Sequence, residues 1–585
     1  MGKQEEILGQ YSATPRRKRW LSISKVFSLV LLAFLAAWYS THDIPSVEIF
    51  AAKLPDCHTP LPPIQFYGPL DLQHPALIRA GRQLERAVQS RFKKGTLDSI
   101  NIAIVTAEGS IWELSLGAQR ANETDPLKRG EVNRDSIYRV ASVSKLFTMV
   151  ETLILQQKGV LKLDDPITRF FPNFTYIPYG CSAKDNCEPV EPITLRQLAT
   201  HMSGIARDLP AGEAVNWPQD QSGGGPPPIN GLPFPTTKAV LASIANTSLI
   251  AAPYTVPIYS NTGWSLLGAC NVAANRLFGD DPSPSTHWEL LKRDVLDPLG
   301  FNGTYFLAND ENKARIAIGS AVPEEVDLDF LDWSNPAGGQ MTSLHDLINL
   351  MQSVLEPNTP GAVLTPYTLR EWIRPFHAFG DDYNEIGAAW EILKIPDSYG
   401  IKQRIYQKYG NLASFHSAFA INPEAGFGVA LLTTAAESQT LAIVQDAFKA
   451  FQPAFDRIRA EKAMRMFGGP WELPASRTRK ASQAKITFKQ GSLLVEKLAL
   501  NGTDILELLA RKRGSRGRLW WTGGDEFRVG VDNPGFEGGC FGQFADLDEV
   551  GRKRGTPINT IRFTGPASHR SLVAPAAGIT LRRKL

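Results

Sequence analysis

Apolar residues recur at helical spacing in the stretch that follows residue 142. From position 143 onward they lie three or four positions apart, which predicts a buried helix with apolar positions at Leu146, Phe147, Val150, Leu153 and Ile154. Gly159 is suited to end this helix. Further helical patterns are expected near 75–94, 193–201, 237–247, 262–276 and 440–465.

Shorter apolar runs, bounded by turn residues, predict β-strands. Segments 100–105 and 111–116 are typical of one strand pair, and segments 412–421 and 427–433 are typical of a second. After residue 468 only short alternating segments remain, separated by Gly, Asp and Asn. This pattern predicts a small β-rich C-terminal domain over 466–585.

The N-terminal segments have the pattern of a membrane anchor. Residues 1–19 are polar and end in a basic run, and residues 20–40 are apolar enough for a signal-anchor transmembrane helix or a signal peptide. The basic run favours a cytosolic N-terminus. We therefore expect a single-pass type II membrane protein, or a secreted one, with most of the chain lumenal or extracellular beyond a proline-rich connector at 41–74.

Sequons and cysteines agree with the secretory pathway. Five Asn-x-Ser/Thr sequons are candidate glycosylation sites: Asn122, Asn173, Asn246, Asn302 and Asn501. Cys181 and Cys187 bracket a short polar loop and are expected to form a small disulfide. Cys57 with Cys270 is an alternative for a second bridge, because spacing does not fix connectivity and Cys540 is also available.

Composition excludes several classes of function. The chain of 585 residues is too long for one ordinary core, which favours at least two domains. Its formal net charge of +3 gives no electrostatic signature of nucleic-acid binding. No Cys-x-x-Cys or His-x-His pattern occurs, so neither a metal site nor a cofactor is expected. The sequence does not determine the oligomeric state.

Ser142 and Lys145 form a candidate nucleophile pair at the start of the predicted buried helix. A spacing of three residues places both side chains on one helix face. A serine hydroxyl needs a neighbouring base or cation to become nucleophilic, and a helix start directs free N–H groups outward. Spacing alone does not select this pair, because the same pattern occurs at Ser22–Lys25, Ser90–Lys93 and Ser482–Lys485.

Two later motifs distinguish Ser142 from these other serines. A Tyr-x-Asn motif, Tyr259–Asn261, precedes an apolar helix, and a Lys-x-Gly motif, Lys408–Gly410, opens a predicted strand. In this order the three motifs resemble the serine β-lactamase and penicillin-binding-protein superfamily, in its class C-like branch, over about 75–455. Segments 156–166, 198–204, 336–343 and 422–428 agree with the resemblance, and the tail is similar to the β domain of secreted fungal members.

The resemblance implies an α+β fold, in which an antiparallel sheet flanked by helices carries a helical subdomain, with the small all-β domain appended. It implies that Ser142 attacks an acyl carbonyl and that Lys145 or Tyr259 takes the proton. Lys408 would supply a cationic field and could also bind a substrate carboxylate, and Asn261 would hydrogen-bond within the network. The backbone N–H groups of Ser142 and Asn411 would form the oxyanion hole.

The third motif departs from the family pattern at Tyr409. The middle residue is usually Ser or Thr, whose hydroxyl helps to hold a β-lactam carboxylate. We expect Tyr409 and Gly410 to border the substrate pocket, with the phenol ring narrowing it. Strand alternation offers the other arrangement, in which Tyr409 points away. Either arrangement disfavours true β-lactamase activity.

Three functions follow from these residues. The first is a serine hydrolase that cleaves an ester or amide of a small-molecule acyl substrate through a Ser142 acyl-enzyme. The second is an acyltransferase of the same mechanism, for example in natural-product biosynthesis, favoured if the long loop at 205–236 closes the cleft against water. The third is a non-catalytic binding protein on the same fold.

Overall fold

A computed structural model describes residues 57–584, apart from 183, 186, 189–190, 229, 357, 359–361 and 532–538. The chain divides into two compact units. The smaller unit consists of Met1–Cys57 with Gly535–Gly539, almost all of it outside the described residues. The larger unit, His58–Pro534 with Cys540–Leu585, contains every element discussed below.

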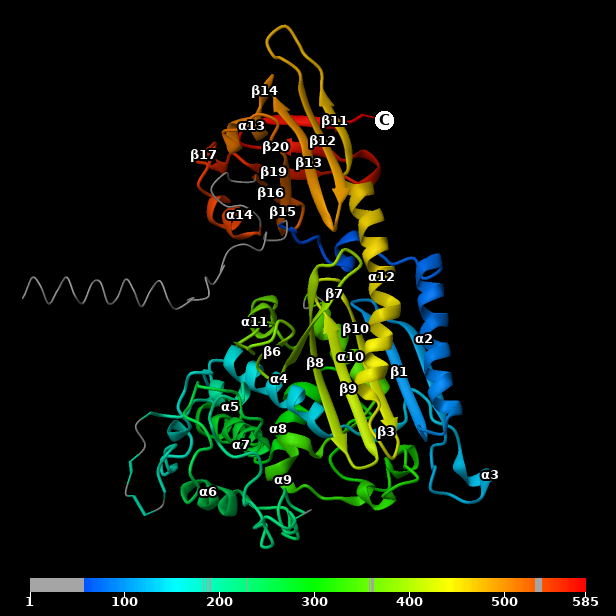
Figure 1. The fold of residues 1–585 in the computed structure, drawn as a ribbon, viewed down its shortest axis with the longest axis vertical. Coiled ribbons are helices and arrows are strands. Elements are labelled where there is room, and N and C mark those ends of the chain that lie inside the picture. The colour runs from blue at the N-terminus through cyan, green and yellow to red at the C-terminus, as the bar shows by residue number, and fades with distance from the viewer. Residues whose placement is uncertain are drawn as a thin grey trace, which may run out of the picture. The chain divides into compact units, whose positions relative to one another are not determined.

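An antiparallel sheet of eight strands forms the centre of the larger unit, in the order β2-β1-β10-β9-β8-β7-β6-β5 (Figure 1). Its strands are β1 (Ser99–Thr106), β2 (Gly109–Gly117), β5 (His377–Ala378), β6 (Asn384–Ile386), β7 (Glu391–Pro396), β8 (Lys402–Leu412), β9 (Phe415–Asn422) and β10 (Phe427–Thr434). Strands β1, β9 and β10 are buried at every position because helices cover both faces. The predicted strand pairs are thus confirmed, as neighbours in one sheet.

Two hydrophobic clusters cover the two faces of this sheet. On one face, α2 (Pro75–Lys93) packs against α12 (Thr440–Phe467), whose Phe455 ring stacks on Phe427 of β10. On the other face, α4 (Ser144–Gln157) and α10 (Leu344–Leu355) belong to the second cluster. The helix predicted from residue 143 is α4, and twelve of its fourteen residues are buried.

Helices continue beyond α4 into a helical region on the same face of the sheet (Figure 1). They are α5 (Leu195–Ala199), α6 (Thr237–Ala245), α7 (Asn261–Phe278), α8 (His287–Leu291), α9 (Leu331–Ser334) and α11 (Pro366–Trp372). A single π-helical turn, η7 (Asn335–Gly339), follows α9 directly. This region corresponds to the predicted helical subdomain.

The C-terminal region is β-rich, as predicted, and its sheet closes on itself. The strand order is β12-β11-β21-β20-β19-β16-β15-β13-β14, and an additional pairing joins β12 at one end to β13, next to the other end, which closes the sheet into a barrel. The bounds are β11 (Gly469–Leu473), β12 (Ser482–Lys489), β13 (Ser492–Leu500), β14 (Thr503–Asp504), β15 (Gly517–Gly523), β16 (Glu526–Val531), β19 (Thr560–Thr564), β20 (Ser571–Ala574) and β21 (Ile579–Arg583). Closure removes open strand edges.

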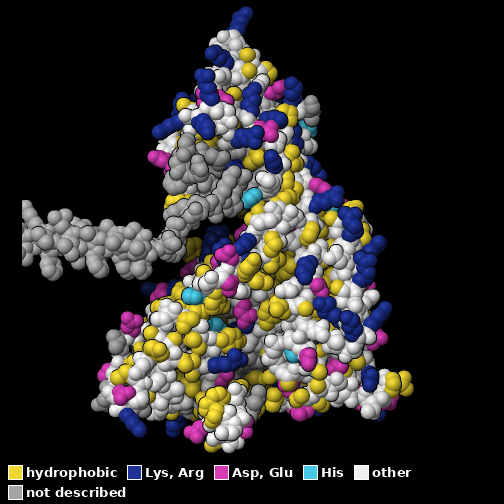
Figure 2. All heavy atoms as spheres, in the orientation of Figure 1, with side chains coloured by type: hydrophobic (Ala, Val, Ile, Leu, Met, Phe, Trp, Pro, Cys, Tyr) yellow, Lys and Arg dark blue, Asp and Glu magenta, His cyan; other side chains and the backbone are white. Residues whose placement is uncertain are grey.

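Two features lie on the surface of the larger unit. On the face in Figure 2, Lys and Arg side chains are dispersed among Asp and Glu and form no continuous strip. The five sequon asparagines all have exposed side chains, which leaves the predicted glycosylation open to test: Asn122, Asn173, Asn246, Asn302 and Asn501.

No helix within the described part of the chain is long and apolar enough to cross a membrane, and the predicted anchor at 20–40 lies outside that part.

The cysteines confirm one prediction and correct another. Cys181 and Cys187 form the predicted small disulfide. Cys270 is a buried free thiol inside α7, so the alternative bridge between Cys57 and Cys270 is wrong. Both Cys57 and Cys540 are disulfide-bonded.

Candidate active site

Ser142 lies in a buried turn between a short strand and α4. The strand β3 (Ile137–Arg139) pairs with β4 (Met341–Ser343), and the 3₁₀ turn η2 (Ala141–Val143) follows it. Ala141 has a φ of 44°, which is uncommon for a residue with a Cβ and bends the chain sharply before the nucleophile. The Ser144 hydroxyl fixes the turn, donating to the Ala141 carbonyl and accepting from Gln340 N–H.

Lys145 connects Ser142 to the rest of the site. Its Nζ donates to Ser142 Oγ at 3.0 Å, to Asn261 Oδ1 at 2.8 Å and to the Ala337 carbonyl at 2.6 Å. The side chain is fully buried, and this burial lowers the pKa of the Lys145 ammonium. A lysine in this state is unprotonated more often near neutral pH than an exposed one, so it is more available to accept a proton.

Tyr259 approaches Ser142 from the other side. Its hydroxyl donates to Ser142 Oγ at 2.6 Å. Burial alone would raise the pKa of the Tyr259 phenol, but the ammonium groups of Lys145 and Lys408 outweigh burial and lower that pKa to about 8. Both ammonium nitrogens lie over the ring, at 5.0 Å and 5.2 Å from its centroid. Either Tyr259 or Lys145 is therefore placed to accept the serine proton.

Asn261 holds Lys145 from the first turn of α7. Ser260 caps this helix, its hydroxyl accepting from Gly263 N–H. Asn261 accepts from Lys145 through Oδ1 and donates through Nδ2 to Asp208 Oδ1 at 2.8 Å. Asp208 in turn pairs with Arg207 at 3.1 Å. The amide is thus fixed in one orientation between a cation and a carboxylate.

His201 supports the ring of Tyr259 and does not reach Ser142 by any described contact. The two rings stack with centroids 4.5 Å apart. Its Nδ1 accepts from Ser260 N–H at 3.0 Å. Burial, followed by the nearby cations, holds the pKa of the His201 imidazole well below its ordinary value, so the ring is neutral. These contacts make His201 a support for the Tyr259 ring.

Lys408 is locked in place by Glu391, a residue that the sequence did not single out. Its Nζ lies 2.5 Å from Glu391 Oε1 on the neighbouring strand β7 and also donates to the Tyr409 carbonyl. The Lys408 side chain is only 2% exposed. Burial would lower the pKa of the Lys408 ammonium, but the Glu391 carboxylate raises it, so Lys408 is a fixed cation.

Gly410 allows β8 to approach the nucleophile turn. A Cβ at this position would lie 2.0 Å from the Val140 carbonyl oxygen and 2.5 Å from Ser417 Oγ. Ser417 uses that hydroxyl to donate to the same Val140 carbonyl at 2.8 Å. The glycine is thus required by contact with the backbone two residues before Ser142 and does not itself line the cavity.

Tyr409 points away from the site, which corrects the prediction that it lines the substrate pocket. Its ring packs with the cluster on the α2 and α12 face of the sheet, and its hydroxyl donates to Gln407 Oε1. Lys408 takes the opposite face because successive side chains alternate along a strand. The Tyr409 ring therefore does not narrow the pocket.

Asn411 and Ser142 line the same cavity, as their predicted oxyanion role requires. Pairing between β7 and β8 ends at Glu391 opposite Gln407, so the segment of β8 from Lys408 to Leu412 has no β7 partner there. The Asn411 side chain is held by a 3.0 Å contact between Oδ1 and His416 Nδ1. The oxyanion role of both backbone N–H groups stays a prediction.

A cavity of about 550 Å³ opens beside Ser142. Three segments supply most of its lining: the predicted long loop, with Pro226–Pro228 and Phe234; a segment from Val322 to Trp333; and the end of β8. The rings of Phe234 and Phe330 are in contact, with centroids 4.5 Å apart, so the first two segments meet at the cavity. Its volume suits a small-molecule ligand.

Comparison with known proteins identifies the family. The family model Beta-lactamase matches residues 84–452. The chain belongs to the β-lactamase family. Beta-lactamase-like protein str6 from the fungus Strobilurus tenacellus is 39% identical over 307 residues, which cover 51% of this chain and 99% of the relative. Beta-lactamase-like protein str5 from the same fungus is 40% identical, over 45% of this chain and 91% of its own length.

Solved structures show that the fold is shared. The β-lactamase/D-alanine carboxypeptidase from Yersinia pestis superposes with a TM-score of 0.50 at 19% identity, covering 65% of this chain and 99% of its own. The octameric penicillin-binding protein homologue from Pyrococcus abyssi gives the same TM-score at 17% identity over 86% of this chain and 99% of its own. Members of this superfamily are generally serine hydrolases, and some are non-catalytic.

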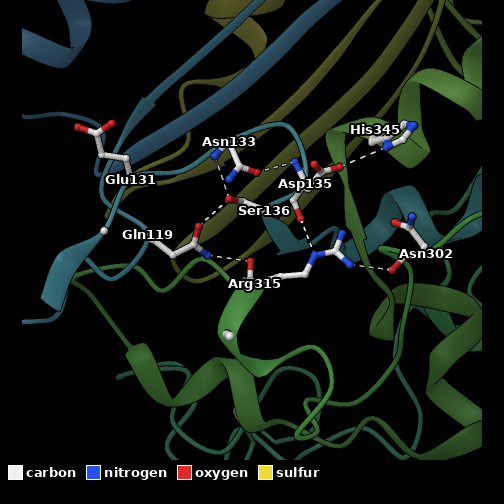
Figure 3. Close-up of a pocket in the computed structure, with 10 residues that line it drawn as sticks. Gln119, Glu131, Asn133, Asp135, Ser136, Asn302, Arg315 and His345 are labelled. Atoms are coloured by element: carbon white, nitrogen blue, oxygen red, sulfur yellow. Dashed lines mark hydrogen bonds and ion pairs between the residues drawn. The ribbon is translucent and has the colours of Figure 1, made fainter.

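A second, larger cavity of about 640 Å³ lies apart from this site, and no residue lines both cavities. Figure 3 shows its polar side chains bonded to one another: Ser136 donates to Gln119, His345 contacts Asp135, and Arg315 donates to the Asn302 carbonyl. No lysine lines it, so Ser136 has no cation of the kind that Ser142 has. Ser142 and Asn261 line the smaller cavity, which makes it the candidate active site.

Three charged site residues escaped the sequence analysis: Arg207, Asp208 and Glu391. None of them belongs to one of the three sequence motifs. Each reaches the site through tertiary contacts between segments that are distant in the sequence. One signal was present: Arg207 and Asp208 are the two charged residues in the otherwise apolar start of the loop, 205–212, directly after the 198–204 signature. Glu391 gave no such signal, because its partner Lys408 lies 17 residues away on the next strand.

Proposed function

We propose that this protein is a serine hydrolase that cleaves an ester or amide through an acyl-enzyme on Ser142. The supporting observation is the position of Ser142 Oγ, within 2.6 Å of the Tyr259 hydroxyl and 3.0 Å of Lys145 Nζ at the edge of a cavity. Two groups with lowered pKa values thus contact one hydroxyl, the arrangement that nucleophilic catalysis by serine needs.

The reaction would proceed in two steps, acylation of Ser142 and hydrolysis of the acyl-enzyme. Ser142 Oγ attacks the carbonyl carbon while its proton passes to Tyr259 or Lys145, and the N–H groups of Ser142 and Asn411 stabilise the oxyanion. Collapse breaks the bond to the leaving alcohol or amine, which takes up that proton. Water then attacks the acyl-enzyme by the same path, releases the acid and restores the serine.

Acyl transfer is the second candidate, and one observation favours it. The long loop at 205–236 contributes lining residues to the cavity, and its Phe234 contacts Phe330 on the opposite side. A cavity bordered in this way limits the access of water to the acyl-enzyme. An alcohol or amine would then replace water in the second half of the reaction. A binding protein without catalysis has no need of a serine held by two titratable partners.

Purified full-length protein distinguishes these functions. It is treated with p-nitrophenyl acetate and p-nitrophenyl hexanoate, and release of p-nitrophenol and intact mass are followed with and without a primary amine or alcohol. Continuous turnover in buffer supports the hydrolase. A mass increase of one acyl group without turnover, followed by turnover when the acceptor is added, supports the transferase. No adduct and no turnover would contradict both enzyme functions.

Glu391→Gln is expected to shift the pH dependence of activity. In the wild type, the rising limb of kcat/KM should lie near the Tyr259 pKa of about 8. The Glu391 carboxylate raises that pKa, so its removal lowers the pKa and moves the limb to lower pH, by about one unit.

The measurement is kcat/KM for an ester between pH 6 and pH 10. Glu385→Gln is the matched control, since Glu385 lies on β6 and pairs with Lys394 and Arg404 instead of Lys408. Its limb should stay at the wild-type pH. A limb that stays in place or moves upward in Glu391→Gln would show that Glu391 does not act on Tyr259.

A further inference from the structure

We propose that Ser142 takes a neutral, apolar acyl group and that the site rejects acyl groups carrying a carboxylate. This inference rests on the proposed acyl-enzyme function and specifies its substrate class. It departs from the expectation that the cation of the Lys-x-Gly motif receives a substrate carboxylate. Three features of the site support it: the pairing of Lys408, the charge balance of the cavity and its apolar lining.

The ammonium of Lys408 is not available to a substrate anion. Two of its three N–H donors bind the Glu391 carboxylate and the Tyr409 carbonyl, and only 2% of its side chain is exposed. A substrate carboxylate would have to displace the Glu391 carboxylate from its ion pair with the buried Lys408 ammonium. Breaking such a pair leaves an uncompensated buried charge, which is strongly unfavourable.

The charges that line the cavity sum to a net negative value. Arg207 is paired with Asp208, and it is the only Lys or Arg among the lining residues that the structure describes. Glu325 is buried, and its carboxylate accepts from Ser414 N–H and the Ser414 hydroxyl. Glu324 lines the cavity as well and is exposed. A carboxylate brought in by the substrate would thus meet an excess of like charge, with Arg207, already paired with Asp208, as the one described lining cation.

The lining that faces these charges is apolar. Pro227, Phe234, Leu328, Phe330 and Trp333 all border the cavity. Its volume of about 550 Å³ admits an acyl chain of several carbons together with its leaving group. Each methylene buried there contributes about 0.8 kcal/mol, so a longer apolar acyl chain should react better than acetyl.

Buried Arg139 keeps one part of this lining in position. Its guanidinium donates to the backbone carbonyls of Glu325, Val326 and Gly339. Arg139 lies three residues before Ser142 on β3. The apolar segment that contains Leu328 and Phe330 is therefore attached to the strand that presents the nucleophile, which makes the cavity a stable feature of the site.

The test compares two esters with six-carbon acyl groups, p-nitrophenyl hexanoate and mono-p-nitrophenyl adipate. They differ at the far end of the chain, where the adipate carries a carboxylate. We expect kcat/KM to favour hexanoate over adipate by about 100-fold, and hexanoate over acetate by at least about 10-fold. Glu324→Lys should reduce the preference for hexanoate over adipate about 10-fold. Glu311→Lys is the matched control, exposed outside the cavity, and should keep the wild-type ratio.

Equal rates for hexanoate and adipate, or a preference for adipate, would overturn the substrate class while leaving the acyl-enzyme intact. Trp333→Ala adds a second readout, since it should lower kcat/KM for hexanoate more than kcat/KM for acetate. A wild-type protein that forms an acetyl adduct on Ser142 but shows no chain-length preference contradicts only this inference. A wild type that reacts with none of the three esters contradicts the proposed function as well.

Discussion

Ser142→Ala is expected to lower kcat/KM for ester hydrolysis by about 10⁵-fold. Removal of the hydroxyl leaves no atom between Tyr259 and Lys145 that can attack a carbonyl, so only background hydrolysis should remain. The substitution should not unfold the protein, because the turn is fixed by Ser144 and its bonds to Ala141 and Gln340. The measurement is p-nitrophenol release, with the melting temperature recorded for each variant.

Ser90→Ala is the matched control for this variant. Ser90 and Lys93 have the same spacing, also on a helix, but both side chains are exposed on α2. Activity should stay within about twofold of the wild type, because surface substitutions away from special features have small effects. A Ser142→Ala protein that retains more than a few per cent of the wild-type rate would rule out Ser142 as the nucleophile.

Lys145→Met is expected to lower kcat/KM by about 10³-fold. Methionine keeps the volume but removes the three hydrogen bonds of Nζ to Ser142, Asn261 and the Ala337 carbonyl. It also removes the largest cationic influence on Tyr259, whose pKa should rise above about 8. The remaining activity should therefore have its rising limb at a higher pH than the wild type.

The pH profile of kcat/KM separates this effect from loss of folding. Lys158→Met is the control, because Lys158 follows α4 and pairs with Asp294, away from Ser142. It should keep the wild-type pH limb even if its melting temperature falls. A Lys145→Met protein with an unchanged limb and near-normal rate would show that Lys145 serves packing only.

The positions that the sequence predicted well are those set by local spacing. Ser142 and Lys145 lie three residues apart, and Tyr259 and Asn261 lie two apart at a helix start, so local geometry aligns them. Lys408 and Gly410 likewise lie two residues apart on one strand, where local geometry places them on the same face. The structure brings the side chains of Ser142, Lys145, Tyr259 and Asn261 into one hydrogen-bonded group, with Lys408 over the Tyr259 ring.

The positions that the sequence missed or misplaced depend on pairing between distant segments. Glu391 meets Lys408 because the register of β7 on β8 begins at this point, which no local pattern encodes. Tyr409 faces away because a strand has a period of two, but the sequence did not show which face carries the site. Closure of the C-terminal sheet likewise depends on the β12–β13 pairing.

The sequence also did not predict which segments line the cavity. The proline-rich loop at 205–236 was recognised as unusual, but its contact with Phe330, nearly a hundred residues away, is a tertiary feature. Cys270 could be assigned to a bridge only while its burial inside α7 was unknown. Both features depend on tertiary packing between segments that are distant in the sequence.

The most direct test of the account is to locate a covalent adduct on the protein. Full-length wild type, Ser142→Ala and Ser90→Ala are labelled with a serine-reactive fluorophosphonate, digested, and mapped by peptide mass. We predict one adduct in the wild type and in Ser90→Ala, on the peptide that contains Ser142, and none in Ser142→Ala. Labelling that persists in Ser142→Ala, that maps to another residue, or that is absent from the wild type would contradict the claim that Ser142 is the nucleophile.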